Sequence, residues 1–120
     1  MARHEKIDYI ELSTPDLEAT KTFFTQVFGW KFTDYGPDYA DSPDGGIMVG
    51  FFRGDLNSHQ ETGGALVTFY SADLETTQSK VEIAGGTIIK PTFPFPGGRR
   101  FQFLEPSGNE LAVWSDKEHP

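Results

Sequence analysis

Cysteine and histidine, two of the side chains that most often carry catalytic or metal chemistry, are scarce in this chain of 120 residues. It contains no cysteine, which excludes a disulfide, a thiolate metal site and a cysteine nucleophile. The three histidines, which are other common metal ligands, are His4 beside Glu5, His59 near Glu61, and His119. Because these residues are scattered along the chain and their types are mostly exposed in proteins, we expect them on the surface and predict no metal site from them.

A glycine-rich segment with two arginines, Gly97-Gly98-Arg99-Arg100, has the composition of a phosphate-binding loop. It precedes a predicted strand, whereas a phosphate loop leads into a helix whose dipole favours the anion. The net charge of −8 would repel phosphate backbones, and no other basic stripe is present. We therefore predict neither a phosphate site here nor a nucleic-acid partner.

The hydropathy of the chain predicts no membrane partner. No apolar run approaches the ~18 residues of a membrane span, and the segment Met-Ala-Arg-His-Glu-Lys lacks the apolar core of a signal peptide. We expect a soluble protein, with the cytoplasm as the default location. A chain of this length suits one compact domain, residues 1–120.

The first half of the chain has the pattern of one βαβββ unit, at about residues 5–53. Alternating apolar residues predict a strand at 7–13. Pro15 and the acidic residues after it favour a helix start, and apolar spacing of three to four carries this helix to Phe28, where Gly29 supplies a left-handed cap. Further strands are predicted at 30–35, near Tyr39 and at 47–52, with a turn at Ser42-Pro43-Asp44-Gly45-Gly46.

The second half repeats this plan. Setting Asp16-Leu17-Glu18 upon Asp73-Leu74-Glu75 gives an offset of 57 residues, and the same offset lays Gly29 on Gly86. In this second unit, at about residues 64–116, a helix is predicted at 73–84. Strands are predicted at 65–71, 87–90, 99–104 and 110–115. Residues 53–64 are predicted to be the loop that joins the units, and residues 91–98 a second loop.

A four-stranded sheet with one helix has one bare face, so a single unit could not exclude water from both faces. Two units solve this by pairing. We therefore predict an α+β fold in which two paired βαβββ modules form a half-open mixed β-barrel with the helices outside. The central cleft of such a barrel is the usual place for a small-molecule site.

Several short motifs follow one another in a fixed order through both units. They are Asp16-Leu17, Phe23-Phe24 and Phe28-Gly29-Trp30 in the first, and Asp73-Leu74, Gly85-Gly86, residues 101–103, Glu105-Pro106-Ser107-Gly108-Asn109 and Trp114 in the second. In this order they resemble the glyoxalase, bleomycin-resistance and extradiol-dioxygenase group, the vicinal oxygen chelate superfamily, over nearly the whole chain. The resemblance implies the paired-module fold, a homodimer, and one divalent metal held by histidines on the first strand and glutamates on the last strand of each unit.

The residues at the implied ligand positions do not match that metal site. Seven residues before each helix-opening aspartate stand Tyr9 and Leu66, and four residues after each turn glycine stand Val49 and Ala112. Three of these side chains are hydrocarbons, and one tyrosine falls short of the three or more protein ligands of a catalytic metal. We therefore predict no metal and no cofactor, and do not carry over lactoylglutathione isomerisation or ring-cleaving dioxygenation.

The four positions still mark the strand faces that the resemblance turns toward the cleft. Side chains two apart in a strand share a face, so alternation extends the cleft walls along each strand. The predicted ligand-binding residues are Tyr9, Glu11, Val49, Phe51, Leu66, Thr68, Tyr70, Ala112 and Trp114. The opposite faces are uniformly apolar, as expected beneath the helices: Ile10, Leu12, Val67, Phe69, Leu111 and Val113.

Glu11 is the candidate catalytic residue. A carboxylate among aromatic walls can act as a general base, with Tyr9 as its proton partner, or can bind a cationic ligand. The alternative is a rim carboxylate that stays solvated or pairs with Arg99 or Arg100. Trp114 and Tyr9 likewise have two interpretations, as stacking platforms for a ligand or as core residues.

Three functional hypotheses follow. The leading one is a metal-free small-molecule binding protein, similar to drug-sequestering members of the family, with a planar or aromatic ligand in the cleft. The second is an enzyme: a glyoxalase-like lyase or isomerase, or a dioxygenase, with a relocated metal, or a metal-free catalyst that uses Glu11. The third is an interaction subunit with a vestigial cleft, whose sheet edges serve dimerisation.

Overall fold

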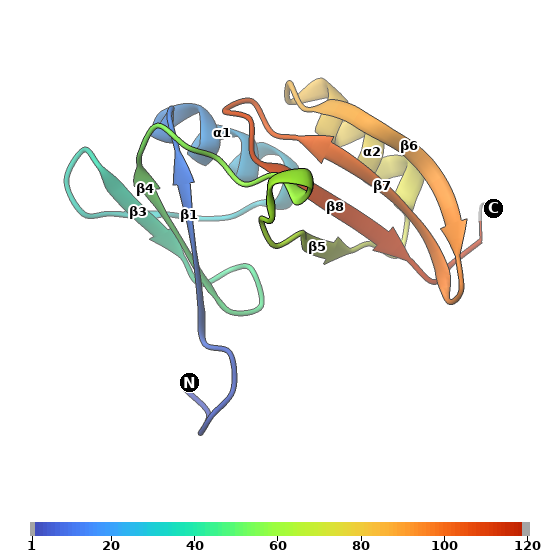
Figure 1. The fold of residues 1–120 in the computed structure, drawn as a ribbon, viewed down its shortest axis with the longest axis horizontal. Coiled ribbons are helices and arrows are strands. Elements are labelled where there is room, and N and C mark those ends of the chain that lie inside the picture. The colour runs from blue at the N-terminus through green and yellow to red at the C-terminus, as the bar shows by residue number, and fades with distance from the viewer. Residues whose placement is uncertain (1, 119–120) are drawn as a thin grey trace.

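Two four-stranded sheets, each with one helix, make up the fold (Figure 1). The computed structural model describes residues 2–118. The first module contains β1 (Tyr9–Thr14), α1 (Leu17–Phe28), β2 (Thr33–Asp34), β3 (Tyr39–Ser42) and β4 (Met48–Arg53), and the second contains β5 (Val67–Tyr70), α2 (Leu74–Ile83), β6 (Thr87–Phe95), β7 (Gly98–Leu104) and β8 (Glu110–Ser115). The strand orders β1-β4-β3-β2 and β5-β8-β7-β6 are equivalent, and in each the first strand runs parallel to the last. The predicted α+β fold of two βαβββ modules is confirmed.

The internal repeat reappears at the helix starts. Asp16 caps α1 by accepting a hydrogen bond from the backbone N–H of Ala19 at 3.1 Å, and Asp73 caps α2 through Thr76 at 3.2 Å. Each carboxylate satisfies a backbone donor that the first helical turn leaves free. The predicted helix start at Pro15 is wrong by two residues, because Asp16 is the cap and the helix begins after it.

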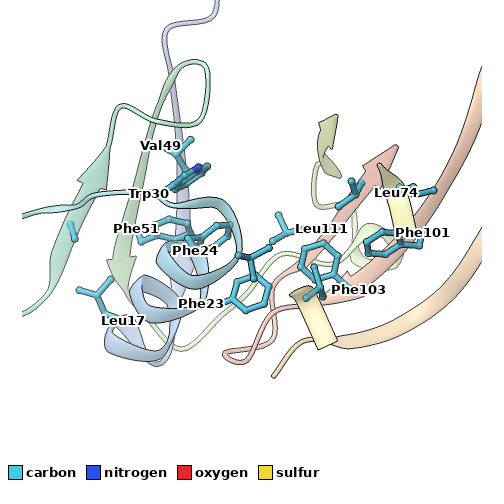
Figure 2. Packing of buried hydrophobic residues seen from close by; sticks show 14 residues of the cluster. Leu17, Phe23, Phe24, Trp30, Val49, Phe51, Leu74, Phe101, Phe103 and Leu111 are labelled. Atoms are coloured by element: carbon cyan, nitrogen blue, oxygen red, sulfur yellow. The ribbon is translucent and has the colours of Figure 1, made fainter. Parts of the chain in front are cut away.

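One hydrophobic core joins the modules. Helices α1 and α2 lie next to each other on the same side of both sheets (Figure 1). Phe24 of α1 packs on Phe51 of its own sheet, with ring centroids 5.2 Å apart, while Phe23 packs on Phe103 of the second sheet at 5.7 Å (Figure 2). We call the sheet faces that point away from the helices the open faces.

Three predicted elements differ in the structure. The strand expected at 30–35 shortens to Thr33–Asp34, because Trp30 turns into the core and stacks on Phe24. The loop expected at 91–98 is largely strand β6, whose prolines are tolerated because β6 is an edge strand with irregular register. The joining loop contains a short 3-10 helix, η1 (Gln60–Thr62). Within residues 2–118, no helix is long and apolar enough to cross a membrane.

Candidate functional site

A pocket of about 500 Å³ lies between the modules, bounded by α1, β1 and β4 on one side and β5 on the other. We call it the inter-module pocket. Its walls are mainly aromatic and aliphatic: Ile10, Leu12, Phe28, Trp30, Val49 and Phe69. Polar side chains reach it at Asp44, Thr68 and Tyr70. An apolar hollow of this size with a few polar groups is the common form of a small-molecule site.

The C-terminal end of α1 builds one wall of this pocket. Gly29 ends the helix in the left-handed region, with φ 73°, which a glycine adopts without strain. The chain then reverses, and the Thr25 hydroxyl donates to the backbone carbonyl of Trp30 at 2.9 Å. The Trp30 indole stacks on Phe24 with centroids 4.8 Å apart. The wall is therefore fixed by both a helix cap and ring stacking.

Gly45 lets the turn before β4 close over the indole. A Cβ at this residue would lie 3.0 Å from a ring carbon of Trp30 and 3.0 Å from a methyl carbon of Val49, closer than ordinary van der Waals contact. The adjacent Asp44 accepts a hydrogen bond from the backbone N–H of Lys31 at 2.8 Å. This bond holds the turn, and its carboxylate, at the mouth of the pocket.

Four of the nine predicted ligand-binding residues line the inter-module pocket: Val49, Phe51, Thr68 and Tyr70. Leu66, Ala112 and Trp114 do not line it. Trp114 instead contacts Tyr70 edge to face on the open side of the second sheet, with centroids 5.2 Å apart. Sequence analysis did not assign Phe28 and Trp30 to a site, since Phe28 was predicted on the buried face of the helix and Trp30 in the strand that follows.

The predicted position of Val49 and Phe51 beside Tyr9 and Glu11 is wrong. In the parallel pair β1 and β4, Ile10 lies opposite Val49 and Leu12 opposite Phe51. Val49 and Phe51 therefore face α1 and are 5% and 0% exposed. The alignment of the two units misplaced them by one residue, which is enough to move a strand side chain to the other face. In the second module the predicted faces are correct, since Thr68 pairs with Ala112 and Tyr70 with Trp114.

Tyr9 and Glu11 belong to a second polar group on the open face of the first sheet. The Tyr9 hydroxyl donates to Asp41 Oδ2 at 3.2 Å and hydrogen-bonds with the Tyr39 hydroxyl. The Tyr39 hydroxyl donates to Glu11 Oε1 at 2.8 Å. Sequence analysis missed Tyr39 and Asp41, although their spacing of two in a strand was the signal that they share a face. We call these four residues the tyrosine–carboxylate chain.

Both phenols of this chain hold their protons strongly. Burial raises the pKa of Tyr39, and its hydrogen bonds with Tyr9 and Glu11 raise it further. Burial also raises the pKa of Tyr9; the hydrogen bond with Tyr39 opposes this, while the charge of Asp41 reinforces it. At neutral pH each phenol is therefore a neutral hydrogen-bond donor.

The two arginines proposed as partners of Glu11 are engaged elsewhere. Arg99 forms an ion pair with Glu75 at 2.5 Å, and the guanidinium of Arg100 lies 5.2 Å from the ring centre of Phe93. Glu11 is exposed and accepts from Tyr39 instead. The expected direct contact between Glu11 and Tyr9 is also replaced, because the Tyr39 hydroxyl bonds to both.

The open face of the second sheet is partly covered by the joining loop. The backbone N–H of Gln60, in η1, donates to Glu110 Oε1 at 2.8 Å, and the Gln102 amide donates to Glu110 Oε2 at 2.7 Å. Gln102 is fully buried, and its amide oxygen has no hydrogen-bond partner among the described residues. A segment predicted only to connect the modules thus occupies part of the surface predicted as cleft.

The donor set does not fit a divalent metal. Of the implied ligand positions only Tyr9 carries a donor atom, and its hydroxyl is bonded to Tyr39 and Asp41. His4 pairs with the neighbouring Glu5 at 2.7 Å, and His59 hydrogen-bonds with Asn57 at 3.0 Å. His119 lies outside the described residues. Residues 2–118 contain no group of three or more His, Cys, Asp or Glu arranged to hold an ion.

Comparison with known proteins identifies a matching family model and similar sequences. Residues 6–113 match the model of the glyoxalase/bleomycin resistance protein/dioxygenase superfamily. The anthracycline biosynthesis protein DauV of Streptomyces sp. (strain C5) is 31% identical over 124 residues, covering 88% of this chain and 45% of that protein. The chain therefore spans less than half the length of this relative.

Solved structures of low sequence identity share the fold. A glyoxalase/bleomycin resistance protein/dioxygenase family enzyme from Burkholderia phytofirmans PsJN aligns with a TM-score of 0.77 at 18% identity, over 92% of this chain and 100% of that chain. The fosfomycin resistance protein FosX from Mesorhizobium loti aligns with a TM-score of 0.74 at 17% identity, over 94% and 93% of the two chains. Together with the family match over most of its length, this establishes that the chain belongs to the glyoxalase/bleomycin resistance protein/dioxygenase superfamily.

Proposed function

We propose that this protein binds a planar, largely apolar small molecule in the inter-module pocket, without a metal. The observation that carries the proposal is the pocket itself, about 500 Å³ with Phe28, Trp30 and Phe69 in its walls. Aromatic walls favour a flat ligand, because stacked or edge-on ring contacts add about 0.5–1.5 kcal/mol to the burial of apolar surface. Asp44 and Thr68 are the polar groups available to orient such a ligand.

Two similar proteins support a small-molecule role. One is an anthracycline biosynthesis protein and another a fosfomycin resistance protein. This chain corresponds to part of the first, and its identity to the second is 17%. The ligand class is therefore argued from the pocket and not from either relative.

The fluorescence of Trp30 tests the proposal directly. The chain has two tryptophans, so Trp114→Phe leaves Trp30 as the single emitter, in the wall of the pocket. We expect neutral planar compounds such as quinoline and anthraquinone to change its emission in a saturable way. A panel of such compounds that leaves Trp30 emission unchanged would contradict the proposal.

A pocket-filling substitution separates this site from surface binding. Ile10 is half-buried and lines the pocket, so Ile10→Phe adds a ring where the ligand would lie. We expect binding to weaken by about tenfold or more, the equivalent of about 1.4 kcal/mol. Ile83→Phe, the same change on the exposed surface of α2, is the matched control and should bind as the parent does.

The metal-free part of the proposal has its own measurement. We expect nickel, zinc and manganese ions to leave the melting temperature unchanged, because a ligand that binds only the folded state would raise it. A saturable rise with any of these ions would favour the alternative, an enzyme with a relocated metal.

We also propose that the chain forms a homodimer. Ile7, Phe52 and Leu56 are 76%, 39% and 78% exposed and lie along one groove beside β1. Both β1 and β5 are edge strands, so their outer backbone groups are available to a second copy. Sedimentation equilibrium should give twice the mass of one chain. The Leu56→Glu variant should lower the measured mass toward that of a single chain. A single-chain mass for the parent protein at micromolar concentration would refute the dimer.

A further inference from the structure

The tyrosine–carboxylate chain alternates between residues of two strands, β1 and β3. Asp41 of β3 accepts from Tyr9 of β1, Tyr9 bonds with Tyr39 of β3, and Tyr39 donates to Glu11 of β1. Between these strands runs β4, where Gly50 lies opposite both Glu11 and Asp41. A Cβ at Gly50 would overlap both hydroxyls. The glycine therefore makes room for the two phenols to meet above the sheet.

The tyrosine–carboxylate chain has one hydrogen-bond donor too few for its contacts. It contains three oxygen–oxygen contacts, but each phenol supplies one proton and an ionised carboxylate supplies none. When Tyr9 donates to Asp41 and Tyr39 donates to Glu11, no proton remains for the contact between the phenols. The raised pKa values of both tyrosines keep the number of phenol protons at two at neutral pH. The phenol oxygens therefore keep lone pairs that can accept a hydrogen bond from a donor outside these four residues.

The tyrosine–carboxylate chain also has no positively charged partner among the described residues. Asp41 is 8% exposed, and neither Asp41 nor Glu11 forms an ion pair within residues 2–118. Burial of a carboxylate without a cation is costly, so such groups are normally paired. Basic side chains of the same module pair with other carboxylates: Lys21 with Asp34 and Arg53 with Asp38.

The tyrosine–carboxylate chain is accessible to solvent. Tyr9 is 39% exposed and Glu11 is exposed, so a ligand can reach the phenol oxygens from the open face. The faces of tyrosine rings attract cations that lie within about 6 Å of the ring centre. An ammonium group that binds at this surface can therefore interact with a tyrosine ring as well as with phenol and carboxylate oxygens.

We propose that Tyr9, Glu11, Tyr39 and Asp41 form a binding site for an organic primary ammonium group. Its N–H bonds supply the missing donor, and its charge offsets those of Glu11 and Asp41. A magnesium or calcium ion suits the group less well, because these ions require six or more oxygen ligands and the phenols here remain protonated. The site lies on the opposite face of the first sheet from the inter-module pocket and is independent of the function proposed for that pocket.

The probe is benzylammonium, with benzyl alcohol as the neutral analogue of similar shape. NMR with 13C-labelled tyrosine rings follows Tyr9 and Tyr39 directly, assigned through Tyr9→Phe and Tyr39→Phe. We expect benzylammonium to shift both sets of signals in a saturable way at pH 7, whereas benzyl alcohol leaves them in place. The signals of Tyr70, on β5 of the second sheet, serve as an internal control; Tyr35 is unsuitable because its ring centre lies 6.1 Å from that of Tyr39.

Charge-removing variants make the test specific. Glu11→Gln and Asp41→Asn should each weaken benzylammonium binding by about tenfold or more, because each removes a negative charge and the charge-assisted hydrogen bond that it makes to the ammonium group. Glu82→Gln makes the same change on α2, far from the chain, and should leave binding within about twofold of the parent. If Asp41→Asn unfolds the buried site, Glu11→Gln at its exposed end still decides the question.

Three results would overturn the proposal. They are equal shifts with benzyl alcohol, an unchanged affinity in Glu11→Gln, and saturation by magnesium or calcium chloride without an amine. The last result would identify an inorganic cation site in place of an ammonium site.

Discussion

Phe28 of α1 and Phe69 of β5 stack face to face across the two modules, with ring centroids 4.2 Å apart and planes 3° from parallel. Both rings also line the inter-module pocket. The contact that joins the modules and the wall of the proposed ligand site are therefore the same structure. Changes at this contact should affect stability and binding together.

We expect Phe28→Ala and Phe69→Ala each to lower the free energy of unfolding by about 2 kcal/mol, less than the 3–5 of a fully buried phenylalanine because both rings are half-buried. The double variant should reveal a coupling of about 1 kcal/mol, typical of stacked rings. Urea unfolding measures all three. Phe52→Ala, at a ring 39% exposed on the open face, is the control and should cost less. Strict additivity of the two substitutions would show that the stacking carries no energy of its own.

A buried carboxylate links the modules on the other side of α1. Glu105 is 2% exposed and accepts from the Thr20 hydroxyl at 3.0 Å and from the backbone N–H of Asn109 at 2.9 Å. Loss of this acceptor leaves buried donors unsatisfied, which costs about 1–3 kcal/mol. Glu105→Ala should therefore lower the midpoint of urea unfolding, and Thr20→Val should lower it by less, because it leaves the other bonds of Glu105 intact. Glu82→Ala, at an exposed residue of α2, should change the urea midpoint little. If it lowers the midpoint as much as Glu105→Ala does, the hydrogen bonds of Glu105 make no specific contribution to stability.

Local sequence signals predicted the elements well where one residue type decides the geometry. The helix-opening aspartates and the left-handed Gly29 are examples, and the repeat of 57 residues located both helices. These features depend on interactions within one or two turns of chain. They led directly to the correct fold.

The site was harder to predict because its residues meet through strand register. An error of one residue placed Val49 and Phe51 on the wrong face, although they still line the inter-module pocket from the helix side. Tyr39 and Asp41 were missed because β3 has four residues, too few for a clear alternation. Trp30 was predicted in a strand, although the left-handed Gly29 cap is the local signal that the residue after it packs back on the last turns of the helix, here on Phe24.

Alkaline pH should destabilise the fold through the tyrosine–carboxylate chain. The raised pKa of Tyr9 and Tyr39 means that the unfolded chain loses these phenol protons first, near the ordinary value of 10.0. Below that pH both states hold the protons and the contribution is constant. Above it the folded state binds more protons than the unfolded state, so the free energy of unfolding falls as pH rises.

The melting temperature measured from pH 8 to 11.5 checks this. Tyr39→Phe should flatten the decline above about pH 10, since it removes the phenol with the most strongly raised pKa. Tyr35→Phe, at a tyrosine that does not belong to the tyrosine–carboxylate chain, should leave the slope of melting temperature against pH unchanged. A parent slope identical to that of Tyr39→Phe would contradict the expectation.

Gly50→Ala tests whether the Tyr9 and Tyr39 hydroxyls can contact each other only because Gly50 has no Cβ. The backbone of Gly50 does not have positive φ, so alanine is compatible with the strand, but its Cβ would overlap the hydroxyls of Tyr9 and Tyr39. Both side chains must then move apart, at a cost of about 1–3 kcal/mol for overpacking. We expect an unchanged far-UV circular dichroism spectrum, a lower melting temperature, and tyrosinate absorbance at 295 nm that develops at lower pH than in the parent. Because the added methyl group points to the open face, Trp30 should respond to pocket ligands as before. Tyrosine titration as late as in the parent would mean that the two hydroxyls do not meet above Gly50.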